Sequence, residues 1–170
     1  MPNTVPPVLT AERFEEKADI FRSKSHVDFA LFGAITEENL GTGDIAELAA
    51  AGATAFKTFM ATSFGPLLMS DKGELYRAFE EVAAADRPLY IHAEDEEYLD
   101  LFRERALEAY GDDMAGFFAA RPPIAETTAV SDVLDIVADT GTETVIVHTT
   151  TADAVDRTQA AKAAGRPVWT

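Results

Sequence analysis

The stretch TAFKTFM, residues 54–60, combines the composition of a β-strand with a single lysine, Lys57, among large apolar side chains. Side chains alternate along a strand, so Lys57 and Phe59 are expected on one face and Phe56 and Met60 on the other. A lysine is costly to bury as a cation. The stretch therefore predicts a buried strand, and it raises the question of what chemistry requires an amine there.

Four other short apolar runs of strand length flank this stretch along the chain. They are VDFALFGAI (27–35), PLYIHAE (88–94), TVIVHTT (144–150) and PVWT (167–170). Helical patterns lie between them, which is typical of a parallel sheet covered by helices. The fold class is therefore predicted to be α/β.

Helix boundaries and domain organisation can also be predicted. Asp44 is the expected N-cap of one helix and Gly52 its end. The gap 95–143 is too long for one crossover helix, so a helical excursion is expected within it. Because the chain begins at MPNTVPP and ends on a predicted strand, we expect a single domain, 1–170, that is incomplete at both ends.

Composition narrows the possible functions. The chain has 47% hydrophobic residues, no cysteine, and a net charge of -16 from 30 acidic and 14 basic residues. Such a surface repels phosphate backbones and anionic lipid, so neither nucleic acid nor a membrane is an expected partner. A cytoplasmic location is expected, since no apolar run of membrane-spanning length and no export signal occurs. Scarce lysine with surplus acid resembles adaptation to a salt-rich cytoplasm.

Three basic residues stand near the carboxyl ends of three successive predicted strands: Lys57, His92 and His148. In parallel α/β sheets, this end of the strands carries ligand-binding and catalytic groups. Strict alternation places His92 on the same face as Glu94, and His148 on the same face as Ile146. Three such residues on neighbouring strands indicate a common site.

The residues alone leave three interpretations of Lys57 open. Burial would lower the pKa of the amine and leave a neutral nucleophile. Such an amine can form a Schiff base with a carbonyl substrate, or it can add carbon dioxide to become a carbamate that binds metal. Alternatively, the side chain reaches along the strand end to solvent.

The ordered motifs MPNTVPP, VDFALFGA, GATAFKTFM, YIHAED, RPPIAE and VIVHTT resemble the cyclic-amide branch of the amidohydrolase superfamily, which contains dihydroorotases, allantoinases and dihydropyrimidinases. The resemblance covers residues 1–170. It implies a portion of a (β/α)8 TIM-like barrel, with about five or six of the eight strands present. It also implies one or two divalent metal ions, usually Zn²⁺, at the carboxyl face.

The resemblance assigns roles to individual residues. Lys57 matches the lysine that these enzymes carbamylate with carbon dioxide, and His92 and His148 match histidines that bind metal together with the carbamate. Asn3, in Met-Pro-Asn-Thr, resembles a dihydroorotase residue that binds the substrate carboxylate. Ser63, or second Thr62, matches a hydroxyl residue of a loop that closes over substrate. Glu94 and Asp95 are expected to hydrogen-bond around His92 rather than to bind metal.

Two features of the family pattern are missing from these 170 residues. The family's His-X-His pair and its catalytic aspartate are absent, and the remaining histidine, His26, is expected on the surface. We therefore expect a metal-dependent cyclic amide hydrolase, most like dihydroorotase, which interconverts dihydroorotate and carbamoyl aspartate in pyrimidine synthesis. We expect little activity from this chain by itself. A small cyclic amide is the expected substrate, and a homo-oligomer the expected assembly.

Three rival functions stay open at this point. An allantoinase or a dihydropyrimidinase-type hydantoin hydrolase would share most of the motifs. A class I aldolase-like enzyme would use Lys57 in a Schiff base, although the two histidines would then lack a role. A non-catalytic, amidohydrolase-like assembly protein would typically have lost the three ligand positions that this chain retains.

Overall fold

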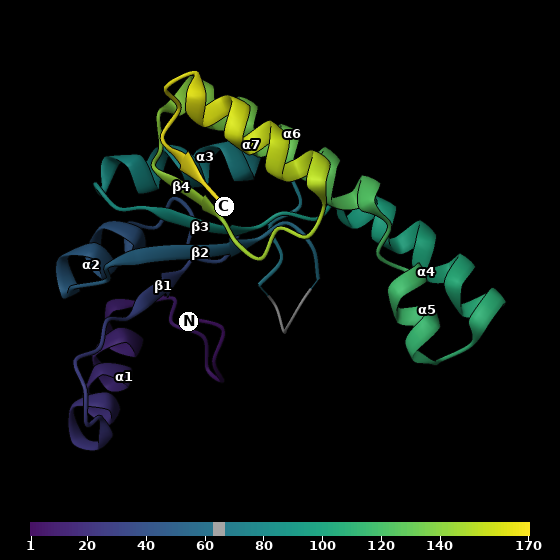
Figure 1. Ribbon diagram of the computed structural model, residues 1–170. Coiled ribbons are helices and arrows are strands. Elements are labelled where there is room, and N and C mark those ends of the chain that lie inside the picture. Colours follow the sequence, from purple (N-terminus) through teal and green to yellow (C-terminus); the bar gives the residue numbers. More distant parts are fainter. Residues whose placement is uncertain (63–66) are drawn as a thin grey trace.

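The computed structural model describes residues 1–62 and 67–170, which are built around a five-stranded parallel sheet (Figure 1). The strands are β1 (Phe32–Ala34), β2 (Ala55–Phe59), β3 (Leu89–His92), β4 (Thr144–Ile146) and β5 (Val168–Trp169). They pair in their order along the chain, and every pair is parallel. This confirms the α/β prediction, and the sequential order is that of strands in a (β/α)8 barrel.

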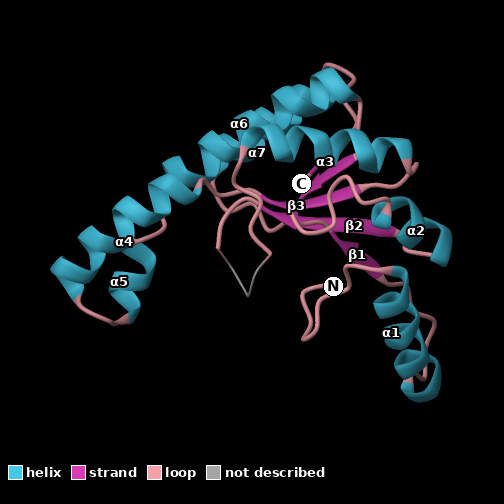
Figure 2. Cartoon of the chain, turned by 180° about the vertical axis from the view of Figure 1, so that it is seen from behind, coloured by secondary structure: helices cyan, strands magenta, loops and turns pink. Residues whose placement is uncertain are grey.

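Helices separate the strands. They are α1 (Ala11–Lys24), α2 (Asp44–Ala51), α3 (Lys72–Ala84), α4 (Glu96–Tyr110), α5 (Met114–Ala119), α6 (Pro123–Thr140) and α7 (Ala152–Ala163). Helices α3, α6 and α7 cover one side of the sheet, whereas α4 and α5 extend away from it as an arm (Figures 1 and 2). The arm is the helical excursion predicted for the long gap between strands.

The sheet has two different faces. Phe56, Leu89 and Ile91 point toward the helices and are fully buried in the main core, where each such side chain contributes roughly 2–3 kcal/mol by leaving water. Lys57 and Phe59 point the other way, as the alternation predicted. On that face Phe59 packs with residues of the N-terminal half of the chain rather than with helices. The face opposite the helices therefore carries Lys57, the candidate functional residue of β2.

Two predicted strands are shorter than expected. The run 27–35 pairs only at Phe32–Ala34, because Val27 is exposed and Phe29 packs its ring against Phe21 of α1. The run 144–150 pairs only at Thr144–Ile146, after which the chain turns. Apolar composition predicted the location of both strands but overestimated their length.

One predicted helix cap is wrong. The N-cap of α2 is Gly43, with φ 95°, and Asp44 is the first helical residue. The Asp44 carboxylate accepts a hydrogen bond from the hydroxyl of Thr42 instead of from a helix amide. Gly52 ends the helix with φ 110°, as predicted, because glycine tolerates this left-handed conformation. Among the described residues, no helix is long and apolar enough to cross a membrane.

Candidate metal centre

The amine of Lys57 lies inside the protein. The residue is only 1% exposed, so the interpretation that its side chain extends to solvent is wrong. The amine donates a hydrogen bond of 2.7 Å to the carbonyl oxygen of Thr58 and lies 3.6 Å from the centre of the Phe59 ring. Burial lowers the pKa of Lys57 from 10.5 to about 7. In a large fraction of the molecules, the side chain is therefore a neutral, nucleophilic amine at neutral pH.

His92 and His148 face each other through one nitrogen of each ring. Nδ1 of His92 lies 3.2 Å from Nε2 of His148, and the ring centres are 4.9 Å apart. Two nitrogen ligands bound at 2.0–2.1 Å to one tetrahedral zinc ion lie about 3.3 Å from each other. The spacing of this pair therefore fits two ligands of one ion.

The path that brings His148 to this position differs from the prediction. Strict alternation placed His148 on the face of Ile146, but Ile146 is buried against the helices. The strand ends there, and His148 adopts a φ of 47°, which is uncommon for a residue with a side chain. This turn redirects the ring toward His92. Burial, followed by the charges of His92 and Lys57, lowers the pKa of His148.

Phe59 connects the lysine to the histidine pair. It is aligned with His92 in the pairing of β2 with β3, and the centres of the two rings are 5.9 Å apart. The amine of Lys57 lies over the same phenyl ring. The three basic residues singled out in the sequence are thus gathered around one end of β2, β3 and β4.

Glu94 contacts the outward nitrogen of His92. Its Oε2 lies 2.7 Å from Nε2 of His92 and also forms an ion pair with Nη1 of Arg121. Burial alone would raise the pKa of Glu94, but the hydrogen bond from His92 and the charge of Arg121 outweigh it, and the net pKa is lowered. The hydrogen bonding expected around His92 is therefore present for Glu94, whereas Asp95 caps α4 instead.

Glu126 anchors the loop that follows His148. Its carboxylate accepts hydrogen bonds from the backbone nitrogen and the hydroxyl of both Thr150 and Thr151, over distances of 2.6–3.0 Å. Burial raises the pKa of Glu126, and these hydrogen bonds lower it by more. Sequence reasoning missed Arg121 and Glu126 as individual residues, although both belong to the motif RPPIAE that had signalled the family.

The predicted substrate residues are not joined to this cluster. Asn3 is half-buried, and it belongs to the N-terminal segment, which lies on the side of the sheet away from α6 and α7 (Figure 1). Thr62 is exposed and donates its backbone N–H to Glu96. Ser63 lies outside the described residues. Among the described contacts, no hydrogen bond links Asn3 or Thr62 to the lysine or the histidine pair, and His26 is exposed as predicted.

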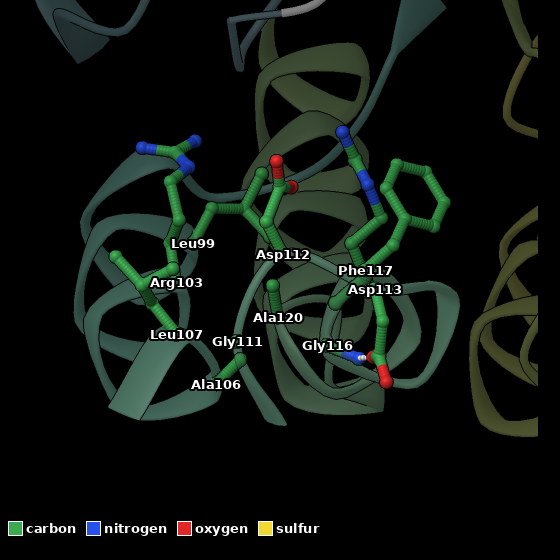
Figure 3. Close-up of a pocket in the computed structure, with 11 residues that line it drawn as sticks. Leu99, Arg103, Ala106, Leu107, Gly111, Asp112, Asp113, Gly116, Phe117 and Ala120 are labelled. Carbon is green, nitrogen blue, oxygen red and sulfur yellow. Dashed lines mark hydrogen bonds between the residues drawn. The ribbon is translucent and has the colours of Figure 1, made fainter. Parts of the chain in front are cut away.

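A pocket of about 500 Å³ opens beside the histidine pair. His92, Glu94, Arg121, Glu126 and His148 are among the residues that line it. A smaller hollow of about 230 Å³ lies between α4 and α5, where Leu99, Leu107 and Ala120 form its apolar wall (Figure 3). The larger pocket gives a small molecule access to the two imidazoles, whereas the hollow in the arm contains neither.

The donor set determines what the cluster could bind. Within residues 1–62 and 67–170, no three His, Cys, Asp or Glu side chains converge as a ligand set. Two imidazoles and a neutral amine are present instead, and Glu94 is already engaged with the far side of His92. Two imidazoles suit zinc, and the amine becomes an anionic oxygen ligand only after modification.

Comparison with known proteins identifies relatives of one kind. The sequence is 33% identical over 170 residues to an L-hydantoinase of Paenarthrobacter aurescens, covering 99% of this chain and 36% of that protein. It is 32% identical over 164 residues to an allantoinase of Rubrobacter xylanophilus, covering 96% of this chain and 36% of that protein. It is 34% identical over 156 residues to a dihydroorotase of Methanosarcina mazei, covering 91% of this chain and 33% of that protein. No family model matches the chain.

The structural comparison gives the same result. The solved L-hydantoinase (dihydropyrimidinase) of Arthrobacter aurescens superimposes with a TM-score of 0.92 and 32% identity, over 99% of this chain and 37% of that one. The predicted portion of a (β/α)8 barrel is thereby confirmed. The chain spans about a third of the length of the relatives it matches.

Proposed function

Because the chain is homologous over nearly its full length to members of the cyclic-amide branch of the amidohydrolase superfamily, we propose that it carries part of the centre of a metal-dependent cyclic amide hydrolase. Lys57, His92 and His148 are the proposed ligands. The observation that carries the proposal is a buried amine of lowered pKa on the sheet face of His92, whose Nδ1 lies 3.2 Å from Nε2 of His148.

Lys57 contributes through its neutral form. The lone pair of the amine attacks the carbon of carbon dioxide, a nitrogen–carbon bond forms, and the nitrogen releases a proton, which leaves a carbamate with one negative charge. Burial favours the attack because it lowers the pKa of the amine, whereas the anionic carbamate would need a cation nearby to offset its own desolvation. The carbamate then supplies the oxygen ligand that the described carboxylates do not.

The two imidazoles would complete the ligand set on the same side of the sheet. These residues would hold a divalent ion, which we propose to be Zn²⁺, and the ion would supply polarisation of a ring carbonyl and a bound water molecule of lowered pKa for opening a cyclic amide. The 170 residues contain no His-X-His pair. They therefore supply one metal position, and we expect low turnover from them alone.

The competing aldolase-like function explains fewer of the contacts. A Schiff-base lysine needs a neutral amine, which Lys57 provides. A Schiff-base mechanism, however, gives no role to the 3.2 Å contact between His92 and His148. The assembly-protein alternative likewise leaves the retained lysine and histidines without a role. Borohydride reduction with a carbonyl substrate should therefore leave Lys57 unmodified.

The ring substrate is the finer part of the proposal. We retain dihydroorotate as a candidate because Asn3 matches the motif on which that expectation depends. Hydantoins and allantoin stand beside it, since an L-hydantoinase and an allantoinase match 99% and 96% of this chain, whereas the dihydroorotase matches 91%. Turnover of the three substrates by one zinc-loaded preparation, with N3L as the comparison variant, ranks them. If Asn3 binds a substrate carboxylate, N3L should raise the KM for dihydroorotate alone.

Zinc binding tests the proposed site directly. Chelator competition with the 170-residue chain in bicarbonate buffer should give one zinc ion per chain. H92A and H148A should each weaken binding at least tenfold, because each removes a ligand. H26A is the matched control, since His26 is exposed and remote from the pocket. Equal weakening by all three variants, or by none, would contradict the assignment.

A further inference from the structure

The hydrogen bonds around His92 determine which of its nitrogens carries the proton. An ionised carboxylate only accepts hydrogen bonds, so the 2.7 Å contact with Glu94 requires Nε2 of His92 to be the donor. A neutral imidazole has one N–H, and Nδ1 of His92 must therefore hold a lone pair. That lone pair faces Nε2 of His148, which lies 3.2 Å from Nδ1. The proposed ion would be bound by these two nitrogens.

Glu94 is itself held in place. Its side chain is only 15% exposed, and the same Oε2 atom that contacts His92 is paired with Arg121 from the turn between α5 and α6. The guanidinium fixes the position of the carboxylate. Arg121 thus holds Glu94, and Glu94 in turn contacts the imidazole of His92.

We propose that Glu94, held by Arg121, is a positioning residue that keeps His92 in the Nε2–H tautomer and directs the Nδ1 lone pair toward the metal position. Glu94 does not bind the ion in this arrangement. Carboxylates behind histidine ligands typically change metal affinity 10- to 100-fold when they are removed. The inference deepens the proposed function, since the tautomer matters only if an ion binds, but the tautomer itself is a property of the metal-free chain.

E94L isolates this role, because leucine neither accepts nor donates a hydrogen bond. E94Q is the conservative variant: Oε2 accepts from both Nε2 of His92 and Nη1 of Arg121, so the amide oxygen of Gln takes that position and still accepts from His92. E104Q is the matched control, because Glu104 is exposed on α4 and the substitution removes the same charge.

Two measurements separate the inference from the proposed function. In the metal-free chain, long-range ¹H–¹⁵N correlation of the histidine side chains at pH 8 should show His92 protonated at Nε2 in the unmodified chain and in E104Q. Protonation at Nδ1 should rise in E94L, whereas E94Q should keep the Nε2–H tautomer. Zinc affinity should fall by at least tenfold in E94L, fall less in E94Q and be unchanged in E104Q.

The two failures are distinguishable. Absence of zinc binding by the unmodified chain would count against the proposed function but would leave the tautomer measurement valid. His92 protonated at Nε2 to the same extent in E94L as in the unmodified chain, or zinc affinity unchanged in E94L, would overturn the role of Glu94.

Discussion

The amine of Lys57 lies 3.6 Å from the centre of the Phe59 ring, two positions further along the same strand. Both side chains leave β2 on the face opposite the helices, so the phenyl ring covers the amine and separates it from solvent. An aromatic face attracts a cation, but the desolvation of Lys57 is the larger effect, because its pKa is lowered and not raised.

This burial predicts how stability depends on pH. The folded-state pKa of about 7 lies below the unfolded value of 10.5, so between these values the unfolded chain holds a proton that the folded chain has lost. The contribution of Lys57 to the free energy of unfolding should therefore rise with pH across this window, by up to about 1.4 kcal/mol per pH unit. Below about pH 7 the full cost of the buried cation is present.

Urea unfolding of K57M against the unmodified chain checks this in metal-free, carbon dioxide-free buffer. K57M should be the more stable protein at pH 6, and its advantage should shrink as the pH rises from 7 toward 10. K24M serves as the control, since Lys24 is exposed at the end of α1. An advantage of K57M that is constant with pH would show that the amine is not desolvated.

A second prediction concerns the loop after His148. E126A should lower the free energy of unfolding by about 2 kcal/mol, because it removes a charged acceptor that serves Thr150 and Thr151. The effect should be present above the ordinary pKa of a glutamate and be lost as the pH falls through the lowered pKa of Glu126.

Hydrogen exchange locates the effect of E126A. The amides of Thr150 and Thr151 should exchange faster in E126A than in the unmodified chain. E108A, which changes an exposed glutamate on α4, should leave both rates unchanged. If these amides stay equally protected in E126A, the carboxylate does not hold the loop.

A third prediction follows from the net charge of -16. Self-repulsion destabilises the folded chain, so the melting temperature at pH 7.5 should rise as KCl is added, most steeply in the first few tenths of a molar. At pH 4.4, near the isoelectric point, the same salt series should have little effect. An equal salt dependence at both pH values would show that the acidic surplus does not set the stability.

Much of the fold could be predicted from the sequence because it depends on local patterns. Alternation along β2 predicted the faces of Lys57 and Phe59, and the strand–helix order predicted the parallel sheet. The length of β1 could not be predicted, because it depends on the packing of Phe29 against Phe21 from another element. Gly43, not Asp44, took the N-cap position of α2, because the chain enters the helix through a turn with positive φ at Gly43.

The candidate site was predictable in its residues but not in its geometry. Lys57, His92 and His148 were found from their places near strand ends. The contact between the histidines depends on a backbone turn at φ 47°, which alternation cannot anticipate. Arg121 and Glu126 act across 24 or more positions in the sequence, so no local pattern revealed their partners.

Carbamylation of Lys57 is the most direct test of the central claim. The measurement is ¹³C NMR of the zinc-loaded chain in ¹³C-labelled bicarbonate, with K57R as the comparison, because a guanidinium stays protonated and does not form the carbamate. We expect a carbamate carbon signal in the unmodified chain, no such signal in K57R, and weaker zinc binding by that variant. No carbamate signal in the unmodified chain, together with equal zinc binding by K57R, would contradict it.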